Sequence, residues 1–345
     1  METAQEKPSV ILSLILVSAV LAVALTVLRD NAYALRILSL AGIYSILALG
    51  LRLAYAEVGE LNLGQSVLFA LGGYLVGIGG TQLGLGHLVG LAVAVAGTAL
   101  VALIVSFITL RLAGAFFAVA TLGLIPVATA LIVNWDGITG GVLGLGGYGG
   151  GIRAPVPLVG ISGQLAWMIA IWVVVLAALL LDHWLRAARF GQALNAIRQD
   201  PVLFASLGFN VTLYRVAAAV ISGTFAGLAG GLYALHEGLV SVSLVGLGLL
   251  ATIIVIVVAG GSRVPGGVVA ASAIMTLVPE YARALGDLRL LVFGVALILL
   301  LKFMPDGVGP FGISGIARLI RLLGLGAETA DTKPASRPSE PGRKV

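Results

Sequence analysis

Apolar runs long enough to cross a lipid bilayer recur along the whole chain, and they constrain its fold more than any other feature. About 20 apolar residues, wound as a helix, cross a hydrocarbon core about 30 Å thick. Because lipid offers no hydrogen-bond partner to an exposed N–H or C=O group, the spanning elements should be helices. We count ten such segments, at approximately 10–28, 37–53, 63–79, 87–110, 116–135, 165–181, 214–235, 247–259, 267–285 and 288–304. The third and eighth are short or rich in glycine and can also be broken or re-entrant helices, which leaves eight to ten full spans.

The composition supports a membrane protein and excludes several other classes. Hydrophobic residues make up 59% of the chain and charged residues 10%, against roughly 25% charged residues in a soluble domain. The chain has no cysteine, which excludes disulfides and thiolate metal sites. Its net charge of +5 does not indicate nucleic-acid binding, because the basic residues lie in loops and the tail, where membrane topology explains them. We therefore predict an all-α polytopic membrane protein.

The predicted organisation is an N-terminal tail at 1–9, a transmembrane domain at 10–312 and a C-terminal tail at 313–345. From about residue 327 the tail is rich in Pro, Ser and charge, so we expect it to be disordered. The first apolar run could also be read as a signal peptide. It is long for that purpose, and Glu2 and Glu6 precede it against the single Lys7, so we predict a span.

The orientation follows from the loop between the sixth and seventh segments, where Arg186, Arg189 and Arg198 gather. An excess of Lys and Arg marks short cytoplasmic loops. With ten spans this places both termini in the cytoplasm and the glycine-rich 136–163 loop outside.

A polar stretch in the same loop contains the signals of a very short helix. Asp200 is a good N-cap, Pro201 suits the first helical position, and Gly208 suits a left-handed residue that ends the helix. The seven residues PVLFASL between these signals would form a helix of about 10 Å, too short to cross a membrane. Its apolar residues recur at helical spacing, so it either offers an apolar surface to another protein or lies against the membrane interface.

Four stretches carry a resemblance to a known family: AIRQDPVLFASLGFNVTLYRVAAAVISGTFAGLAGGLYA in and after this loop, GELNLGQSVLFALGGYLVG at 59–77, RLAGAFFAVATLG with NWDGITGG at 111–141, and LVFGVALILLLKFMPDGVGPFG at 291–312. Together they cover most of residues 45–312. In content, order and spacing the chain resembles the permease subunits of branched-chain amino acid ABC importers. In that family the short helix is a cytoplasmic coupling helix that docks into the ATPase subunit.

The resemblance implies residues and partners for this chain. The residues it assigns to ATPase coupling are Arg198, Asp200, Pro201, Val202, Leu203, Phe204, Leu207 and Gly208. The implied partners are a related second permease, two cytoplasmic ATPase subunits and an extracytoplasmic solute-binding protein, in the bacterial inner membrane. Where the family commonly has two alanines early in the coupling helix, this chain has Leu203 and Phe204, which suggests a docking surface shaped for a particular ATPase.

The sequence argues against ATP hydrolysis or nucleotide binding by this chain. No GxxxxGK[ST] motif is present, so we expect ATP to be hydrolysed by partner subunits and no cofactor to be bound by this chain. The GxGxxG pattern at 144–149 lacks the flanking strand, helix and acidic residue of a dinucleotide site.

The expected function is import of branched-chain or other hydrophobic amino acids by alternating access. The alternatives are urea, short amides or another small polar solute, and an ion-coupled transporter or channel, which should carry more charged residues within its spans.

Polar and small residues inside the apolar segments are the remaining candidates. Asn62, Gln65, Ser66 and Thr121 could line a transport pathway or serve as interhelical hydrogen-bonding residues. Gly223, Gly227 and Gly231 repeat every four residues, as do Gly73 and Gly77, and such repeats favour close helix packing.

Overall fold

The computed structural model describes residues 31–109, 112, 114–147, 163–261 and 264–281, with the isolated positions 18 and 294. In chain order its elements are α2 (Ala32–Arg52), the π-helix η1 (Leu53–Val58), α3 (Gln65–Thr81), α4 (His87–Ile108), α5 (Ala115–Leu122), α6 (Leu124–Asn134), α7 (Asp136–Thr139), β1 (Leu145–Gly146), α8 (Gln164–Ala187), α9 (Arg189–Gln199), α10 (Pro201–Ser206), α11 (Val211–Glu237), β2 (Leu239–Val240), the 3₁₀-helix η3 (Val242–Val245), α12 (Leu247–Gly260) and α13 (Pro265–Tyr281). The predicted all-α class is confirmed, since the two strands have two residues each.

The described helices account for eight of the predicted apolar segments. The helices long and apolar enough to cross a membrane are Ala32–Val58, His87–Ile108, Ala115–Asn134, Gln164–Ala187 and Val211–Glu237, and shorter apolar helices occupy Gln65–Thr81, Leu247–Gly260 and Pro265–Val278. They correspond to the second to ninth segments. The first and tenth segments and both predicted tails lie outside the described ranges, so the total of ten spans stays a prediction.

The fifth segment differs from the continuous helix that its apolar run predicts. α5 ends at Leu122 and α6 begins at Leu124, with Gly123 between them. Pro126 follows in the first turn of α6 and has no N–H to donate to the carbonyl of Leu122. A glycine and a proline within four residues therefore account for the break.

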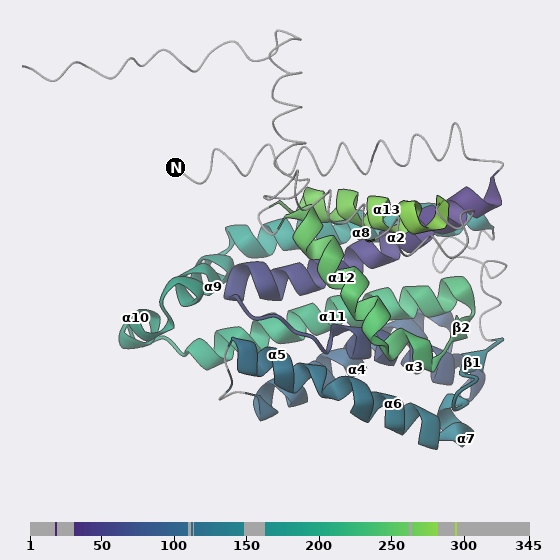
Figure 1. Cartoon of the computed structure of the whole chain (residues 1–345), viewed down its shortest axis with the longest axis horizontal. Helices are drawn as coiled ribbons and strands as arrows, with labels where there is room; N and C mark the ends of the chain where they lie inside the picture. Colours follow the sequence, from purple (N-terminus) through teal and green to yellow (C-terminus); the bar gives the residue numbers. More distant parts are fainter. Residues whose placement is uncertain are drawn as a thin grey trace, which may run out of the picture.

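α11 is the central helix of the bundle (Figure 1). α2, with α8 and α13 packed on it, lies on one side of α11, and α3 and α4 pack closely on the other, with α5 and α6 beyond them. At one end, which we name the α10 end, lie η1, α9, α10 and the start of α11. At the other, the hairpin end, lie α7, β1 and β2, where Leu145 pairs antiparallel with Val240.

Glycines let the helices approach α11 closely. Cβ atoms added at Gly223, Gly227 and Gly231 would meet Ala102, Thr98 and Leu91 of α4, in that order. On the α3 side, a Cβ at Gly230 would collide with the backbone carbonyl of Phe69, and Gly73 faces Val240 of β2. Gly77 is buried within α3. The structure therefore places all five predicted packing glycines inside the helix bundle.

Candidate functional site

α10 is formed by the local signals that its sequence contains. The Asp200 carboxylate accepts hydrogen bonds from the N–H groups of Val202 and Leu203, both at 2.9 Å, and Pro201 occupies the first turn. The helix ends at Ser206, one residue earlier than predicted, and Gly208 adopts the expected left-handed conformation with φ of 88°. Both ends of this short helix are therefore fixed by residues next to it.

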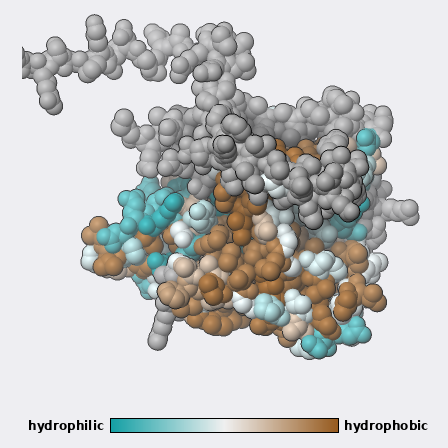
Figure 2. Space-filling model, in the orientation of Figure 1, coloured by the Kyte–Doolittle hydropathy of each residue, from teal (hydrophilic) through white to brown (hydrophobic). Residues whose placement is uncertain are grey.

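The apolar side chains of α10 divide into an exposed set and a buried anchor. Val202 and Leu203 of the helix and Leu207 at its C-cap are 77%, 61% and 68% exposed. Phe204, which the sequence placed on the same apolar surface, is buried instead: its ring stacks on Phe209 at a centroid distance of 4.9 Å and meets Tyr214 edge-on at 5.7 Å. α10 is thus held to the start of α11 by aromatic contacts while its other apolar residues face outward. Figure 2 shows this apolar tip beside hydrophilic surface at the α10 end.

α9 connects α10 to the π-helix η1 by polar contacts. The guanidinium of Arg198 donates to the carbonyl oxygen of Ala56, and the amide of Asn195 donates to the Glu57 carboxylate at 2.9 Å. Both acceptors lie in η1. A displacement of α9 would therefore act directly on the end of the α2–η1 helix.

Beneath α9 lies a buried ionic network that joins three helices. Nη2 of Arg52 donates to both carboxylate oxygens of Asp182, at 2.6 and 2.8 Å, and Nη1 lies 3.7 Å from Glu57. Arg186 lies 3.2 Å from the same Asp182 carboxylate. The side chains of Arg52 and Asp182 are 0% and 1% exposed, so each depends on the other for the interactions that water would otherwise supply.

The segment between η1 and α3, residues 59–64, is non-helical and rich in polar contacts. Gly59 begins it in the left-handed conformation, and Glu60 forms an ion pair with Arg215 of α11 at 3.2 Å. Burial raises the pKa of the Glu60 carboxyl, and the positive charge of Arg215 opposes that rise. The N–H of Leu63 donates to the Thr121 hydroxyl at 3.1 Å. Non-helical backbone beside spanning helices is tolerated where it is covered by protein or lines a water-filled cavity, and this segment has the first kind of cover along much of its length.

The structure brings the four predicted pathway residues together around this segment, in different roles. Gln65 and Ser222 of α11 exchange hydrogen bonds at 3.2 Å, and Ser66 donates to the carbonyl of Val245 at 3.3 Å. Thr121 bonds to Leu63 as described. Gln65, Ser66 and Thr121 therefore connect segments that are distant in the sequence. Asn62 lines a pocket.

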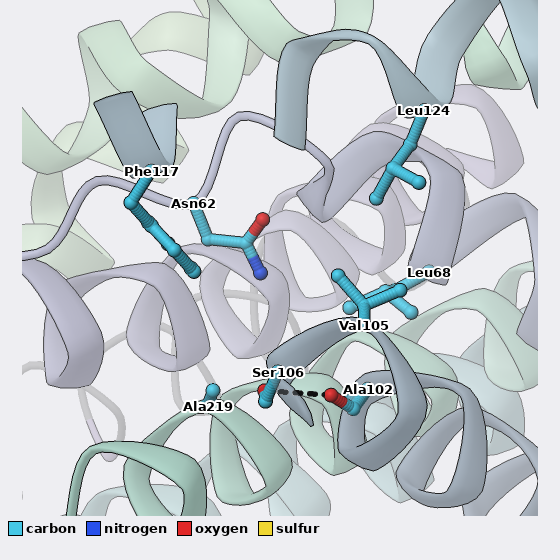
Figure 3. A pocket seen from close by; sticks show the side chains of 8 residues that line it. All are labelled: Asn62, Leu68, Ala102, Val105, Ser106, Phe117, Leu124 and Ala219. Carbon is cyan, nitrogen blue, oxygen red and sulfur yellow. Dashed lines mark hydrogen bonds between the residues drawn. The ribbon is translucent and has the colours of Figure 1, made fainter. Parts of the chain in front are cut away.

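That pocket lies between α3, α4, α5, α6 and α11, and the Asn62 side chain points into it (Figure 3). Its other lining residues are Leu68, Ala102, Val105, Ser106, Phe117, Leu124 and Ala219. A second pocket adjoins it toward the α10 end and contains Glu60 and Arg215. Each has room for only about one or two water molecules.

The ionic network was not predicted from the sequence. Charged residues inside or next to apolar runs in a chain with 10% charge are a usable signal, which Arg52 and Asp182 both give. That they pair with each other could not be predicted from the sequence, because 130 residues separate them.

Comparison with known proteins identifies the family. The family model described as "Branched-chain amino acid transport system / permease component" matches residues 33–301. The branched-chain amino acid permease proteins LivM of Salmonella typhimurium and Escherichia coli are each 29% identical, over 78% and 79% of this chain and 68% and 69% of their own lengths. A probable permease protein LivH of Methanocaldococcus jannaschii is 28% identical over 48% of this chain and 53% of its own. No solved structure matches. Since the family model covers well over half of the residues, this multi-pass membrane protein belongs to the permease components of branched-chain amino acid transport systems.

Proposed function

We propose that the chain is the permease subunit of an ATP-driven importer that moves branched-chain or other hydrophobic amino acids across the inner membrane. The family membership and the printed functions of the LivM and LivH relatives support this assignment. The substrate class rests on those relatives.

The observation that carries the proposal is the exposed apolar tip of α10. Three large aliphatic side chains at 61–77% exposure stand on and directly after a helix of six residues: Val202 and Leu203 in the helix, and Leu207 at its C-cap. A contiguous exposed apolar surface of this kind is typical of a protein contact site. The tip is also mechanically connected, since Phe204 ties it to α11 and α9 ties it to η1. In the proposed importer it is the coupling helix on which the ATPase subunit acts.

The remaining parts of the assembly follow from this role. The α10 end is cytoplasmic in the proposal, as are both termini, and the hairpin end faces the solute-binding protein. A related second permease and two ATPase subunits complete the complex. The chain has no P-loop sequence, so the partners hydrolyse ATP. ATP binding then shifts the permease between outward-open and inward-open states by as much as it favours one over the other.

Cysteine crosslinking tests the docking role, because the chain has no cysteine of its own. We expect Leu203→Cys to crosslink to a cysteine in a co-expressed ATPase subunit. Leu143→Cys is a matched control, since Leu143 is 88% exposed but lies next to β1 at the hairpin end. Crosslinking at Leu143 but not at Leu203, or at neither, would contradict the proposal.

Reconstituted uptake tests the function itself. Vesicles that contain the complete complex, trapped ATP and the binding protein should accumulate leucine, and they should not do so without ATP. Uptake of urea or a short amide in place of leucine would change the substrate class. Uptake by the lone chain driven by an ion gradient would replace the importer with a secondary transporter.

A further inference from the structure

Two small pockets meet inside the chain at the non-helical segment 59–64. The first is mostly apolar and is closed by Leu68, Val105, Leu124 and the ring of Phe117 (Figure 3). The second adjoins it toward the α10 end and contains Glu60, Arg215, Thr109 and Thr212. Ser106, Phe117 and Ala219 belong to both linings, so the pockets are neighbouring parts of one crevice.

The second pocket holds one acidic and one basic side chain side by side. Nε of Arg215 lies 3.2 Å from the Glu60 carboxylate, and the two side chains are 24% and 11% exposed. A guanidinium binds a carboxylate well, and a carboxylate binds an ammonium group. The pair therefore matches both charges of an α-amino acid. Because each charge already neutralises the other, a ligand would replace an existing ion pair, and the site would bind weakly enough to release its ligand.

The first pocket supplies a place for an aliphatic side chain and one further polar contact. Asn62 is 6% exposed and its amide points into the pocket, while its Oδ1 accepts from the N–H of Gly64 at 3.0 Å. Gly64 is also the N-cap of α3, a helix of 17 residues whose N-terminus carries no side-chain cap. The positive end of a helix dipole favours an anionic group, and interrupted helices in transporters place substrate in this way.

The other charged residues of the α10 end do not compete for this role. Arg52 pairs with both Asp182 and Glu57, and neither pocket includes these three residues. Among the residues that line the two pockets, Glu60 and Arg215 are the charged ones.

From this arrangement we propose that the crevice is a transient binding site for an α-amino acid with an aliphatic side chain, located within a single permease chain. Glu60 receives the ammonium group, Arg215 and the Asn62 amide receive the carboxylate, and the apolar pocket receives the side chain. The pockets are too small for leucine in this structure, so the site forms when α5 moves and the ring of Phe117, which lines both pockets, swings aside. This inference rests on the proposed function and adds to it a location and the ligand groups that are recognised.

Protection of an introduced cysteine tests the site in the complete importer. Ser106→Cys places a thiol in the lining shared by both pockets, in a chain with no other cysteine. We expect L-leucine to slow its reaction with a small methanethiosulfonate reagent in the nucleotide state in which the crevice is open. Isoamylamine lacks the carboxylate and 4-methylpentanoate lacks the ammonium group, so each should protect far less. Equal protection by all three, protection by none, or no reaction in any nucleotide state would overturn the proposal.

Variants of the ion pair separate recognition from folding. In the Ser106→Cys background, Glu60→Gln, Arg215→Gln and the double variant should each raise the leucine concentration for half-protection by about tenfold or more. The double variant keeps the net charge and guards against a single unpaired charge that prevents folding. Arg36→Gln with Glu237→Gln is the matched control, because that ion pair, at 2.5 Å, joins the outer ends of α2 and α11 far from both pockets. An unchanged half-protection concentration in the folded double variant would contradict the assignment.

Uptake by the unmodified importer, measured in parallel, distinguishes failure of the proposed site from failure of the importer function. ATP-dependent leucine uptake without leucine protection at position 106 would remove the proposed site and leave the importer function. Absence of ATP-dependent uptake would remove the proposed function.

Discussion

The buried Arg52–Asp182 pair gives the sharpest stability prediction. Removing one member of a buried ion pair typically costs about 3–5 kcal/mol, because the other charge is left uncompensated. Arg52→Met leaves Asp182 in contact with Arg186 at 3.2 Å, so we expect a loss near the lower end, about 3 kcal/mol. Asp182→Leu removes the carboxylate that accepts from Arg52 at 2.6 and 2.8 Å, while Glu57 lies farther from Arg52, at 3.7 Å, so we expect a loss near the upper end, about 5 kcal/mol.

A double variant and a matched control test whether Arg52 and Asp182 stabilise the fold as a coupled pair. Arg52→Met with Asp182→Leu removes both charges and should lose less free energy of unfolding than the sum of the single losses, by at least about 1 kcal/mol. Arg36→Met provides the comparison at the hairpin end, because Arg36 is 49% exposed in its ion pair with Glu237 and should lose only about 0–1 kcal/mol. Reversible unfolding in mixed micelles measures all four. A loss for Arg52→Met no larger than that for Arg36→Met, or a double variant whose loss equals the sum of the single losses, would contradict a coupled buried ion pair.

Three further predictions concern helix packing and α10. Gly230→Ala should destabilise the α3–α11 contact by about 2 kcal/mol or more, because the new Cβ meets a backbone carbonyl. In Gly208→Ala the new Cβ meets no atom within 4 Å, so this variant should cost only the strain of the left-handed backbone, about 1–2 kcal/mol. Thermal unfolding should therefore show a larger loss of stability for Gly230→Ala than for Gly208→Ala. Asp200→Ala removes both N-cap hydrogen bonds, worth about 1 kcal/mol, and should reduce co-purification of the ATPase, while Asp200→Asn should retain it. Leu203→Glu should abolish that co-purification without reducing the folded fraction, since Leu203 is 61% exposed; an unchanged yield of ATPase would argue against the docking surface.

Features with local causes were predictable from the sequence. The boundaries of α10 follow from Asp200, Pro201 and Gly208, which act on backbone groups within a few residues of themselves. The spanning helices follow from apolar length, which lipid requires of every segment separately. The break at Gly123 was also predictable, because a glycine and a nearby proline lie inside an apolar run.

Features with distant causes were not predictable. The apolar pattern of α10 places Phe204 on the same surface as Leu203, yet Phe204 is buried because it contacts Phe209, just before α11, and Tyr214 in α11. Likewise Gln65 and Ser66 are candidates for a pathway or for interhelical hydrogen bonds, and their hydrogen-bond partners in α11 and η3 lie 157 and 179 residues away. A single sequence carries no record of which distant group satisfies a buried polar atom.

The contacts at the α10 end also define how a force on α10 would reach the crevice. α9 is tied to η1 through Arg198 and Asn195, and η1 leads directly into Gly59. If α9 moved alone, it would leave the buried Glu57 carboxylate with one partner fewer, and a buried polar group that loses its partner costs about 1–3 kcal/mol. Movement of η1 together with α9 keeps those bonds and concentrates the backbone change at Gly59, whose left-handed conformation carries no side-chain penalty. The segment beyond it is bonded to Thr121 of α5 through Leu63, so the same displacement is passed to the helix that carries Phe117. The movement that costs the least free energy when a force acts on α10 is therefore a concerted shift of η1, residues 59–64 and α5.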